Sequence, residues 1–156
     1  QRRGLEARVM DALEALAAQP QGSLGGVACV HLIEHLPAAR WMKLFEHAAR
    51  VLRPGGILAV ESPNPETLRV GAGLFWVDPT HLRPVHPEAA RFVAEAVGLE
   101  LVEVRKLRPF PPEQQLAAQV NDERWRPIFQ QLDAWLSGAR DYLLVARKPF
   151  SEKAGS

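Results

Sequence analysis

Short apolar runs and stretches with helical spacing alternate along this chain. Residues 26–32 and 57–60 are nearly continuous apolar runs, which are typical of strands in a parallel sheet that is covered on both faces. Between them, apolar side chains recur at the spacing of an amphipathic helix. Pro37 suits the first turn of this helix, and Pro54-Gly55-Gly56 indicates its end. The pattern therefore predicts a strand, a crossover helix and a second parallel strand.

Further elements are predicted on both sides of this unit. Residues 5–9 are a candidate short strand, and residues 11–18 have the pattern of a short amphipathic helix. Another helix begins at Pro87 and ends at Gly98. Residues 99–107 then alternate between apolar and polar side chains and end beside a proline, which indicates an edge strand.

The C-terminal part predicts one more helix and the last strand. The apolar side chains of this helix recur at helical spacing, so we expect them to face the core: Trp125, Ile128, Phe129, Leu132, Trp135 and Leu136. Residues 142–146 form an apolar strand, and we expect it to pair antiparallel with the strand before the helix. Strands that alternate with helices predict an α/β fold with a largely parallel sheet.

Composition narrows the class of protein. A chain of 156 residues fits one domain. The net charge of +1 gives no reason to expect nucleic acid as a partner, and no apolar run approaches the roughly 18 residues of a membrane span. The single Cys29 lies in an apolar strand pattern and fits a reducing compartment, so we expect a cytoplasmic protein with a buried thiol. The chain begins with Gln1, which suggests a trimmed product.

Several motifs occur in an order that resembles the second half of a class I S-adenosylmethionine-dependent methyltransferase. The resemblance is to the methyltransferases found beside glycosyltransferases of polysaccharide assembly. The motifs are His31-x-x-Glu34-His35-Leu36-Pro37, Leu52-Arg53-Pro54-Gly55-Gly56, Glu61-Ser62-Pro63-Asn64-Pro65, the loop segment Asp78-Pro79-Thr80-His81-x-Arg83-Pro84, and the closing segment from Asp141 to Pro149. The resemblance covers nearly the whole chain and implies a Rossmann-like fold and methyl transfer, with S-adenosylmethionine as the cofactor.

The resemblance also implies where the cofactor would bind. Asp11 would meet the adenine amino group, the backbone of Ala12 would lie against the ring, and His31 would lie beneath the methionine end. From the residue pattern alone, Asp11 is instead a helix N-terminal residue that the helix dipole favours. No strand followed by a glycine-rich turn and a helix occurs in the chain, so the implied cofactor site is at best half present.

The long loop at residues 63–87 supplies the candidate residues for chemistry on the acceptor. We expect His81 to act as the base for a hydroxyl acceptor, with Asp78 beside it. Arg83 is a candidate for holding an anionic or sugar-phosphate group. The candidate substrate-binding residues are His35, Arg83, Trp76 and His86.

Plainer structural roles remain open for two parts of this loop. Asp78-Pro79-Thr80-His81 fits an Asx-type turn whose polar groups satisfy one another. His86 fits a helix-capping position before Pro87. Trp76 either lines a substrate cleft or anchors the loop.

A different class of enzyme shares one of these motifs. His31-x-x-Glu34-His35 matches the pattern of inverted zinc proteases, in which both histidines lie on one helix. Here the motif follows a strand, and Pro37 disfavours a helix through His35. We therefore expect no metal site of this kind and keep zinc hydrolysis only as a remote alternative.

The sequence thus predicts the C-terminal part of a methyltransferase sheet that lacks the first two strands. Residues 1–150 form the partial domain, with a substrate-side loop at 63–87 and a helical insertion at 109–139, and residues 151–156 form a disordered tail. The expected substrate is a small molecule or glycan, methylated on oxygen. The alternative is a non-catalytic interaction module. The strand at 26–32 would have a free edge, which predicts a homodimer through that edge or pairing with residues 5–9.

Overall fold

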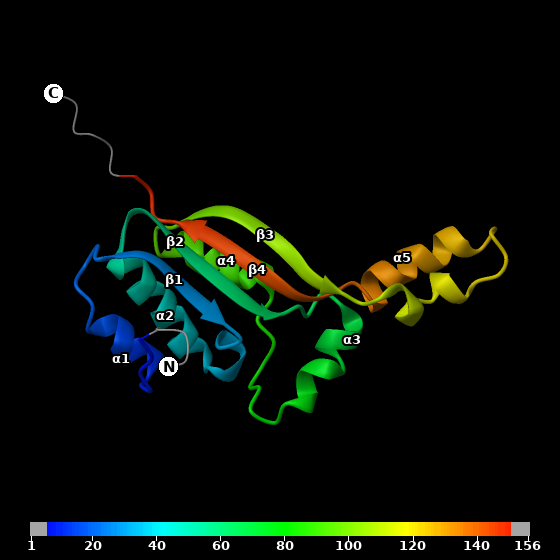
Figure 1. Ribbon diagram of the computed structural model, residues 1–156, viewed down its shortest axis with the longest axis horizontal. Coiled ribbons are helices and arrows are strands. Elements are labelled where there is room, and N and C mark those ends of the chain that lie inside the picture. Colours follow the sequence, from blue (N-terminus) through cyan, green and yellow to red (C-terminus); the bar gives the residue numbers. More distant parts are fainter. Residues whose placement is uncertain (1–5, 151–156) are drawn as a thin grey trace.

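The computed structural model describes residues 6–150 as one mixed sheet with helices and a projecting insertion (Figure 1). The main elements in chain order are α1 (Ala12–Ala17), β1 (Leu24–Val30), η1 (Ile33–His35), α2 (Ala38–Val51), β2 (Leu52–Pro63), α3 (Leu68–Gly71), η2 (Leu74–Val77), α4 (Pro87–Ala96), β3 (Glu100–Pro109), η3 (Pro112–Gln114), η4 (Ala117–Gln119), α5 (Arg126–Leu136) and β4 (Ala139–Arg147). The predicted α/β fold is confirmed.

The sheet has the strand order β1-β2-β4-β3. β1 and β2 are parallel, with Val27 paired to Leu58 and Cys29 to Val60. β4 lies between β2 and β3 and is antiparallel to both, which confirms the predicted antiparallel pair at the C-terminal end. β1 is therefore an edge strand among the described residues.

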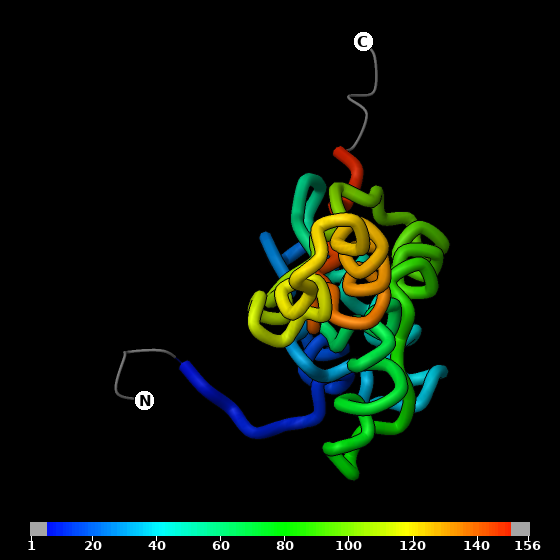
Figure 2. The backbone as a smooth tube through the Cα atoms, turned by 90° about the vertical axis from the view of Figure 1, so that its right-hand side faces the viewer, coloured from blue at the N-terminus to red at the C-terminus, as the bar shows by residue number. Residues whose placement is uncertain are grey.

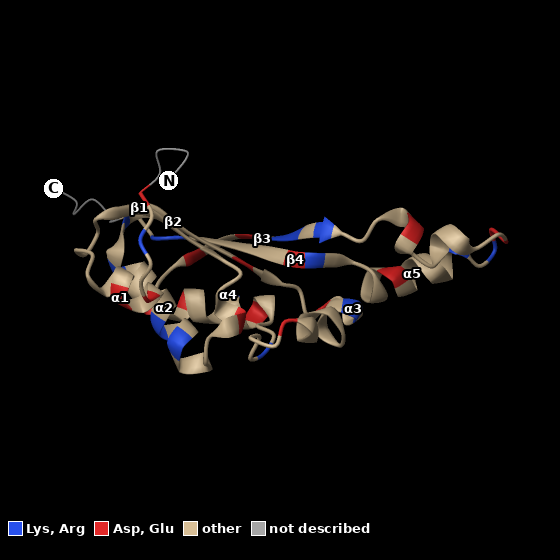
Figure 3. Ribbon diagram, turned by 60° about the horizontal axis from the view of Figure 1, so that its bottom comes forward, with Lys and Arg blue, Asp and Glu red and all other residues tan. Residues whose placement is uncertain are grey.

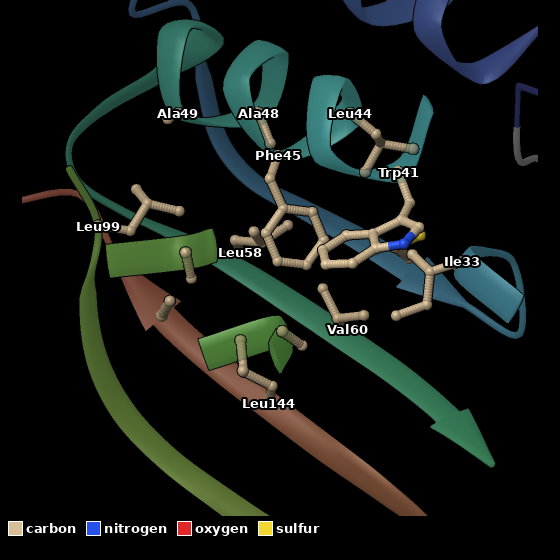
Figure 4. Packing of buried hydrophobic residues seen from close by; sticks show 14 of the residues in the cluster. Ile33, Trp41, Leu44, Phe45, Ala48, Ala49, Leu58, Val60, Leu99 and Leu144 are labelled. Atoms are coloured by element: carbon tan, nitrogen blue, oxygen red, sulfur yellow. The ribbon is translucent and has the colours of Figure 1, made fainter. Parts of the chain in front are cut away.

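The helices α1, α2 and α4 lie on the same side of the sheet (Figure 3). α2 covers the sheet with Trp41, Leu44 and Phe45, and the rings of Trp41 and Phe45 point toward Val60 and Leu58 of β2 (Figure 4). Phe45, Leu58 and Val60 have no exposed surface. This single apolar layer is the core of the described chain.

Two predictions near the N-terminus differ from the structure. Residues 6–9 form no strand, although the edge of β1 is free, and Leu5 lies outside the described residues. The pairing of residues 5–9 with β1 is therefore wrong for the described part. β1 is also not covered on both faces: Ala28 is exposed and Val30 is 60% exposed, because all three packed helices lie on the opposite side of the sheet.

The helical insertion between β3 and β4 projects beyond the end of the sheet (Figure 1), and Figure 2 views the molecule from that end. The apolar side chains of α5 were expected to face the core, but Trp125 is 54% and Trp135 is 73% exposed. The buried residue of this helix is Asp133, whose carboxylate accepts hydrogen bonds from the backbone N–H groups of Leu116 and Ala117. The prediction failed because, within residues 6–150, no second layer covers this apolar face of α5. The predicted tail at 151–156 lies outside the described residues.

The one-sided core predicts a sharp contrast between two phenylalanines. Phe45→Ala removes a fully buried ring and should lower the free energy of unfolding by about 3–5 kcal/mol. Phe92→Ala is the matched control, because this ring is 71% exposed and its loss should change stability by no more than about 0.5 kcal/mol. Urea unfolding followed by circular dichroism measures both. Equal effects would contradict this assignment of the core.

The free edge of β1 keeps the homodimer as a prediction. An unpaired edge offers backbone hydrogen-bonding groups to another chain, and an added lysine opposes such pairing. Val30→Lys on β1 should therefore shift a dimer toward monomer in size-exclusion chromatography with light scattering. Val102→Lys, on the opposite edge strand β3 and 50% exposed, is the control that should leave the mass unchanged. A monomeric unmodified chain would refute self-association.

Candidate functional site

The candidate site lies where the two parallel strands β1 and β2 end. The short turn η1 follows β1, and the loop after β2 returns to lie against it. One backbone hydrogen bond joins these segments directly, from Leu82 N–H to the carbonyl oxygen of Glu34, at 2.9 Å. Ligands of open α/β sheets bind at the carboxyl ends of parallel strands. The fold therefore brings the histidine motif and the Asp-Pro-Thr-His loop to one place.

Asp78 and Thr80 form a compact turn in this loop. Asp78 Oδ1 accepts hydrogen bonds from the Thr80 N–H (2.8 Å) and from Thr80 Oγ1 (2.6 Å). This is the Asx-type turn that the sequence allowed. The hydroxyl and then the backbone N–H of Thr80 lower the pKa of Asp78. Because the hydroxyl proton points to Asp78, Thr80 Oγ1 accepts a hydrogen bond from Nδ1 of His35 at 2.9 Å.

His81 is held by the same loop. Its Nδ1 lies 2.6 Å from the carbonyl oxygen of Phe75 and must be the donor, because a carbonyl can only accept. The His81 ring stacks on the Phe75 ring at 4.4 Å between centroids and lies 4.6 Å from the ring of His35. His81 Nε2 lies 3.9 Å from Asp78 Oδ2. The structure therefore brings His35, Asp78 and His81 together.

Glu34 occurs in two of the sequence motifs but was not among the candidate site residues. Its side chain is completely buried. Its Oε2 accepts a hydrogen bond from Ser62 Oγ at 2.9 Å, and its Oε1 lies 3.1 Å from Nδ1 of His31. One potential ligand atom each of Glu34, His35 and His81 lies within 4.8 Å of the others. In the sequence, the signal for including Glu34 in the site was its position between His31 and His35.

His31 belongs to a second, adjoining polar cluster. It follows β1 with a left-handed backbone (φ 47°), and its Nε2 lies 3.2 Å from Glu61 Oε1. Arg108 also has a left-handed backbone (φ 52°), binds Glu61, and donates from Nε to Asp141 Oδ2 at 2.6 Å. These carboxylates raise the pKa of Arg108. Sequence reasoning missed Arg108, which comes from the far end of β3 and has no local signal.

The other candidate substrate residues are divided between different places. Arg83 and His86 line a separate groove of about 480 Å³ between α2 and α4. His86 caps α4, since its Nδ1 accepts from the Glu88 N–H at 3.2 Å, as the capping alternative predicts. Trp76 is 55% exposed, donates to the Gly71 carbonyl oxygen, and meets the Phe75 ring edge-on, so it anchors the loop beside His81.

The helix required by the zinc-protease motif is absent from the described residues around His31 and His35. Residues 33–35 form a single 3₁₀ turn, and the following helix begins only at Ala38. The rings of the two histidines contact different partners, Glu34 and Thr80. The local geometry therefore gives the hydrolase alternative no support.

Comparison with known proteins shows the family of the chain. The family profile of the methyltransferase domain matches residues 3–104. A crystal structure of a SAM-dependent methyltransferase from Archaeoglobus fulgidus is 32% identical, with a TM-score of 0.81, covering 89% of this chain and 66% of that chain. The chain belongs to the class I SAM-dependent methyltransferase family.

More distant structures share the fold of this methyltransferase chain. The [4+2]-cyclase SpnF is 20% identical with a TM-score of 0.60, covering 92% of this chain and 56% of that chain. Phosphoethanolamine N-methyltransferase 2 from Haemonchus contortus, in complex with S-adenosyl-L-methionine, is 18% identical with a TM-score of 0.56. The match covers 89% of this chain and 36% of that chain. No curated protein matches the chain.

The methyltransferase chain spans slightly less than two thirds of the A. fulgidus protein. The four-stranded mixed sheet of the described residues is consistent with a partial methyltransferase domain. Within residues 6–150, no helix has both the length and the apolar character that a membrane crossing requires.

The residues present fit part of a S-adenosylmethionine site. Ala12 on α1 and Leu32, beside His31, line one apolar hollow of about 190 Å³ against β1, and apolar walls suit the faces of an adenine ring. Asp11 caps α1 through the Leu13 and Glu14 N–H groups and pairs with Arg40, and these contacts lower its pKa, the Glu14 hydrogen bond most. This confirms the helix-terminal role of Asp11, while its role toward adenine stays a prediction.

The methyltransferase chain has one thiol, and its reactivity is predictable. Cys29 is 4% exposed, and burial, followed by the field of Glu34, raises its pKa to about 12. At pH 8 the thiolate fraction is therefore very small. Iodoacetamide should leave folded protein unlabelled and should label Cys29 fully once urea unfolds the chain, as measured by mass spectrometry. Rapid labelling of the folded chain would show that β1 opens locally.

Proposed function

We propose that the intact protein is a S-adenosylmethionine-dependent O-methyltransferase that acts on a hydroxyl group of a sugar, glycan or other small polar molecule. The observation that carries the proposal is the cluster of His35, Asp78 and His81 at the carboxyl ends of the parallel strands. A carboxylate or phosphate acceptor would need no base, whereas a hydroxyl acceptor loses a proton during transfer. The two histidines and the aspartate of this cluster are groups that can accept that proton.

The tautomers of the two histidines support this role. Because Nδ1 of His35 donates to Thr80 and Nδ1 of His81 donates to Phe75, each neutral ring has its lone pair on Nε2. A hydroxyl can donate to such a lone pair. We assign proton removal to His81, which is only 12% exposed and also lines a hollow of about 180 Å³ with Phe75 and Leu74. Asp78 lies beside it, with Oδ2 at 3.9 Å from His81 Nε2.

Cofactor binding is assigned to the other side of the site. Asp11, Ala12 and His31 would hold S-adenosylmethionine, which supplies an electrophilic methyl group on a sulfonium when bound. Transfer then depends mainly on in-line positioning of the hydroxyl oxygen. Trp76 and the Phe75 ring hold the loop that carries His81, so they position this residue.

The first test of the proposal is cofactor binding. S-adenosylhomocysteine is titrated calorimetrically into this chain and into the full-length gene product. Binding to the full-length product is the expected result, and Asp11→Ala should weaken it. Absence of binding to both proteins would favour the interaction module, which the bare edge of β1 also supports.

The second test is methyl transfer by the full-length product to a panel of sugar and small-molecule hydroxyl acceptors. His81→Ala should lower kcat about 10²–10⁴-fold, which is the usual contribution of a positioned base. His47→Ala, on α2 and outside the cluster, should leave kcat unchanged. Undiminished kcat in His81→Ala with a hydroxyl acceptor contradicts the assignment of the base.

A further inference from the structure

The carboxyl group of Glu34 is buried without a fixed positive partner. It has no exposed surface, and its contacts are the Ser62 hydroxyl at 2.9 Å and the His31 ring at 3.1 Å. Across residues 6–150, neither a lysine nor an arginine forms an ion pair with Glu34, and His31 is charged only when protonated. Burial of a carboxylate is unfavourable unless a cation and hydrogen bonds compensate it. A bound cation would provide that compensation.

Two imidazole nitrogens next to Glu34 are oriented as metal ligands usually are. A metal-binding histidine normally donates its other ring N–H to a carbonyl, a carboxylate or another acceptor, which fixes the tautomer and the ring. His81 does this through the Phe75 carbonyl, and His35 through Thr80, whose hydroxyl is in turn held by Asp78. Both Nε2 lone pairs are therefore free, and both rings are already fixed.

We propose that Glu34, His35 and His81 form a binding site for one divalent transition-metal cation. One ligand atom of each lies within 4.8 Å of the others. Two bonds of about 2 Å span at most about 4 Å, so binding requires only a small inward movement of the side chains. Two imidazoles and a carboxylate suit Zn²⁺, Mn²⁺ or Fe²⁺, whereas Mg²⁺ and Ca²⁺ prefer oxygen ligands alone.

The cation site deepens the proposed function and depends on it for its role in catalysis. A cation lowers the pKa of a hydroxyl that contacts it. The two roles of His81 Nε2 are alternatives: without the cation it accepts the hydroxyl proton, and with Nε2 bound to the cation the proton would pass to Asp78 instead, while the electron pair stays on the acceptor oxygen. That pair then forms the bond to the methyl carbon while the carbon–sulfur bond breaks and its electrons go to sulfur.

The test measures cation binding directly, in the absence of cofactor and acceptor. The full chain is stripped with EDTA and titrated with Zn²⁺ by calorimetry, and Mg²⁺ is the comparison. We expect one Zn²⁺ per chain and much weaker Mg²⁺ binding. Glu34→Gln and His81→Ala should each weaken Zn²⁺ binding by at least tenfold, whereas His47→Ala should leave it unchanged. Failure of the unmodified chain to bind Zn²⁺, or equal affinity in His81→Ala and His47→Ala, would overturn the proposal.

Two further measurements apply if either ligand variant fails to fold by circular dichroism. Thr80→Val keeps all three ligands but removes the acceptor for His35 Nδ1, and should weaken Zn²⁺ binding about tenfold. In the unmodified chain, Mn²⁺ should broaden the ring signals of His35 and His81 before those of His47 and His86. Uniform broadening of all histidines would refute the site. If the unmodified protein binds Zn²⁺ but not S-adenosylhomocysteine, the proposed function is refuted and the cation site is not.

Discussion

The buried side chain of Glu34 is the constraint around which the candidate site is organised. Its carboxylate joins the turn after β1 to Ser62 at the end of β2, and its backbone carbonyl holds the returning loop through Leu82. A charged group in this position is costly unless its neighbours are fixed to satisfy it. The residues that contact Glu34 are therefore held in more defined positions than residues of exposed loops usually are. This explains how a loop of irregular structure presents His81 in a defined orientation.

The sequence predicted the elements more completely than the surfaces they bury. Strand and helix patterns gave β1, α2, β2, α4, β3 and β4 in the correct order, because continuous apolar runs and helical spacing are local signals. The same spacing in α5 was misleading, since Trp125 and Trp135 are exposed there. Periodicity shows that one face of a helix is apolar, but it does not show whether another layer is present to cover that face.

Only part of the candidate site could be predicted, again because the signals in the sequence are local. His35, Asp78 and His81 could be identified because they lie in short motifs, and the topology of a parallel sheet brings these motifs together. The separation of Arg83 and His86 from the cluster could not be predicted, because neighbours in a loop can face different sides of it. Arg108 has no local signal and reaches Glu61 and Asp141 only through the pairing of β3 with β4.

The four tryptophans of the chain lie in three different environments. Trp41 is buried against β2, Trp76 stands beside the ring that stacks on His81, and Trp125 and Trp135 are exposed on the projecting insertion. Intrinsic fluorescence of this protein is consequently a sum of three environments. A chain that retains only Trp41 would report the melting of the apolar layer, and one that retains only Trp76 would report events in the loop. The same spectroscopic signal can thus be divided by region without any added label.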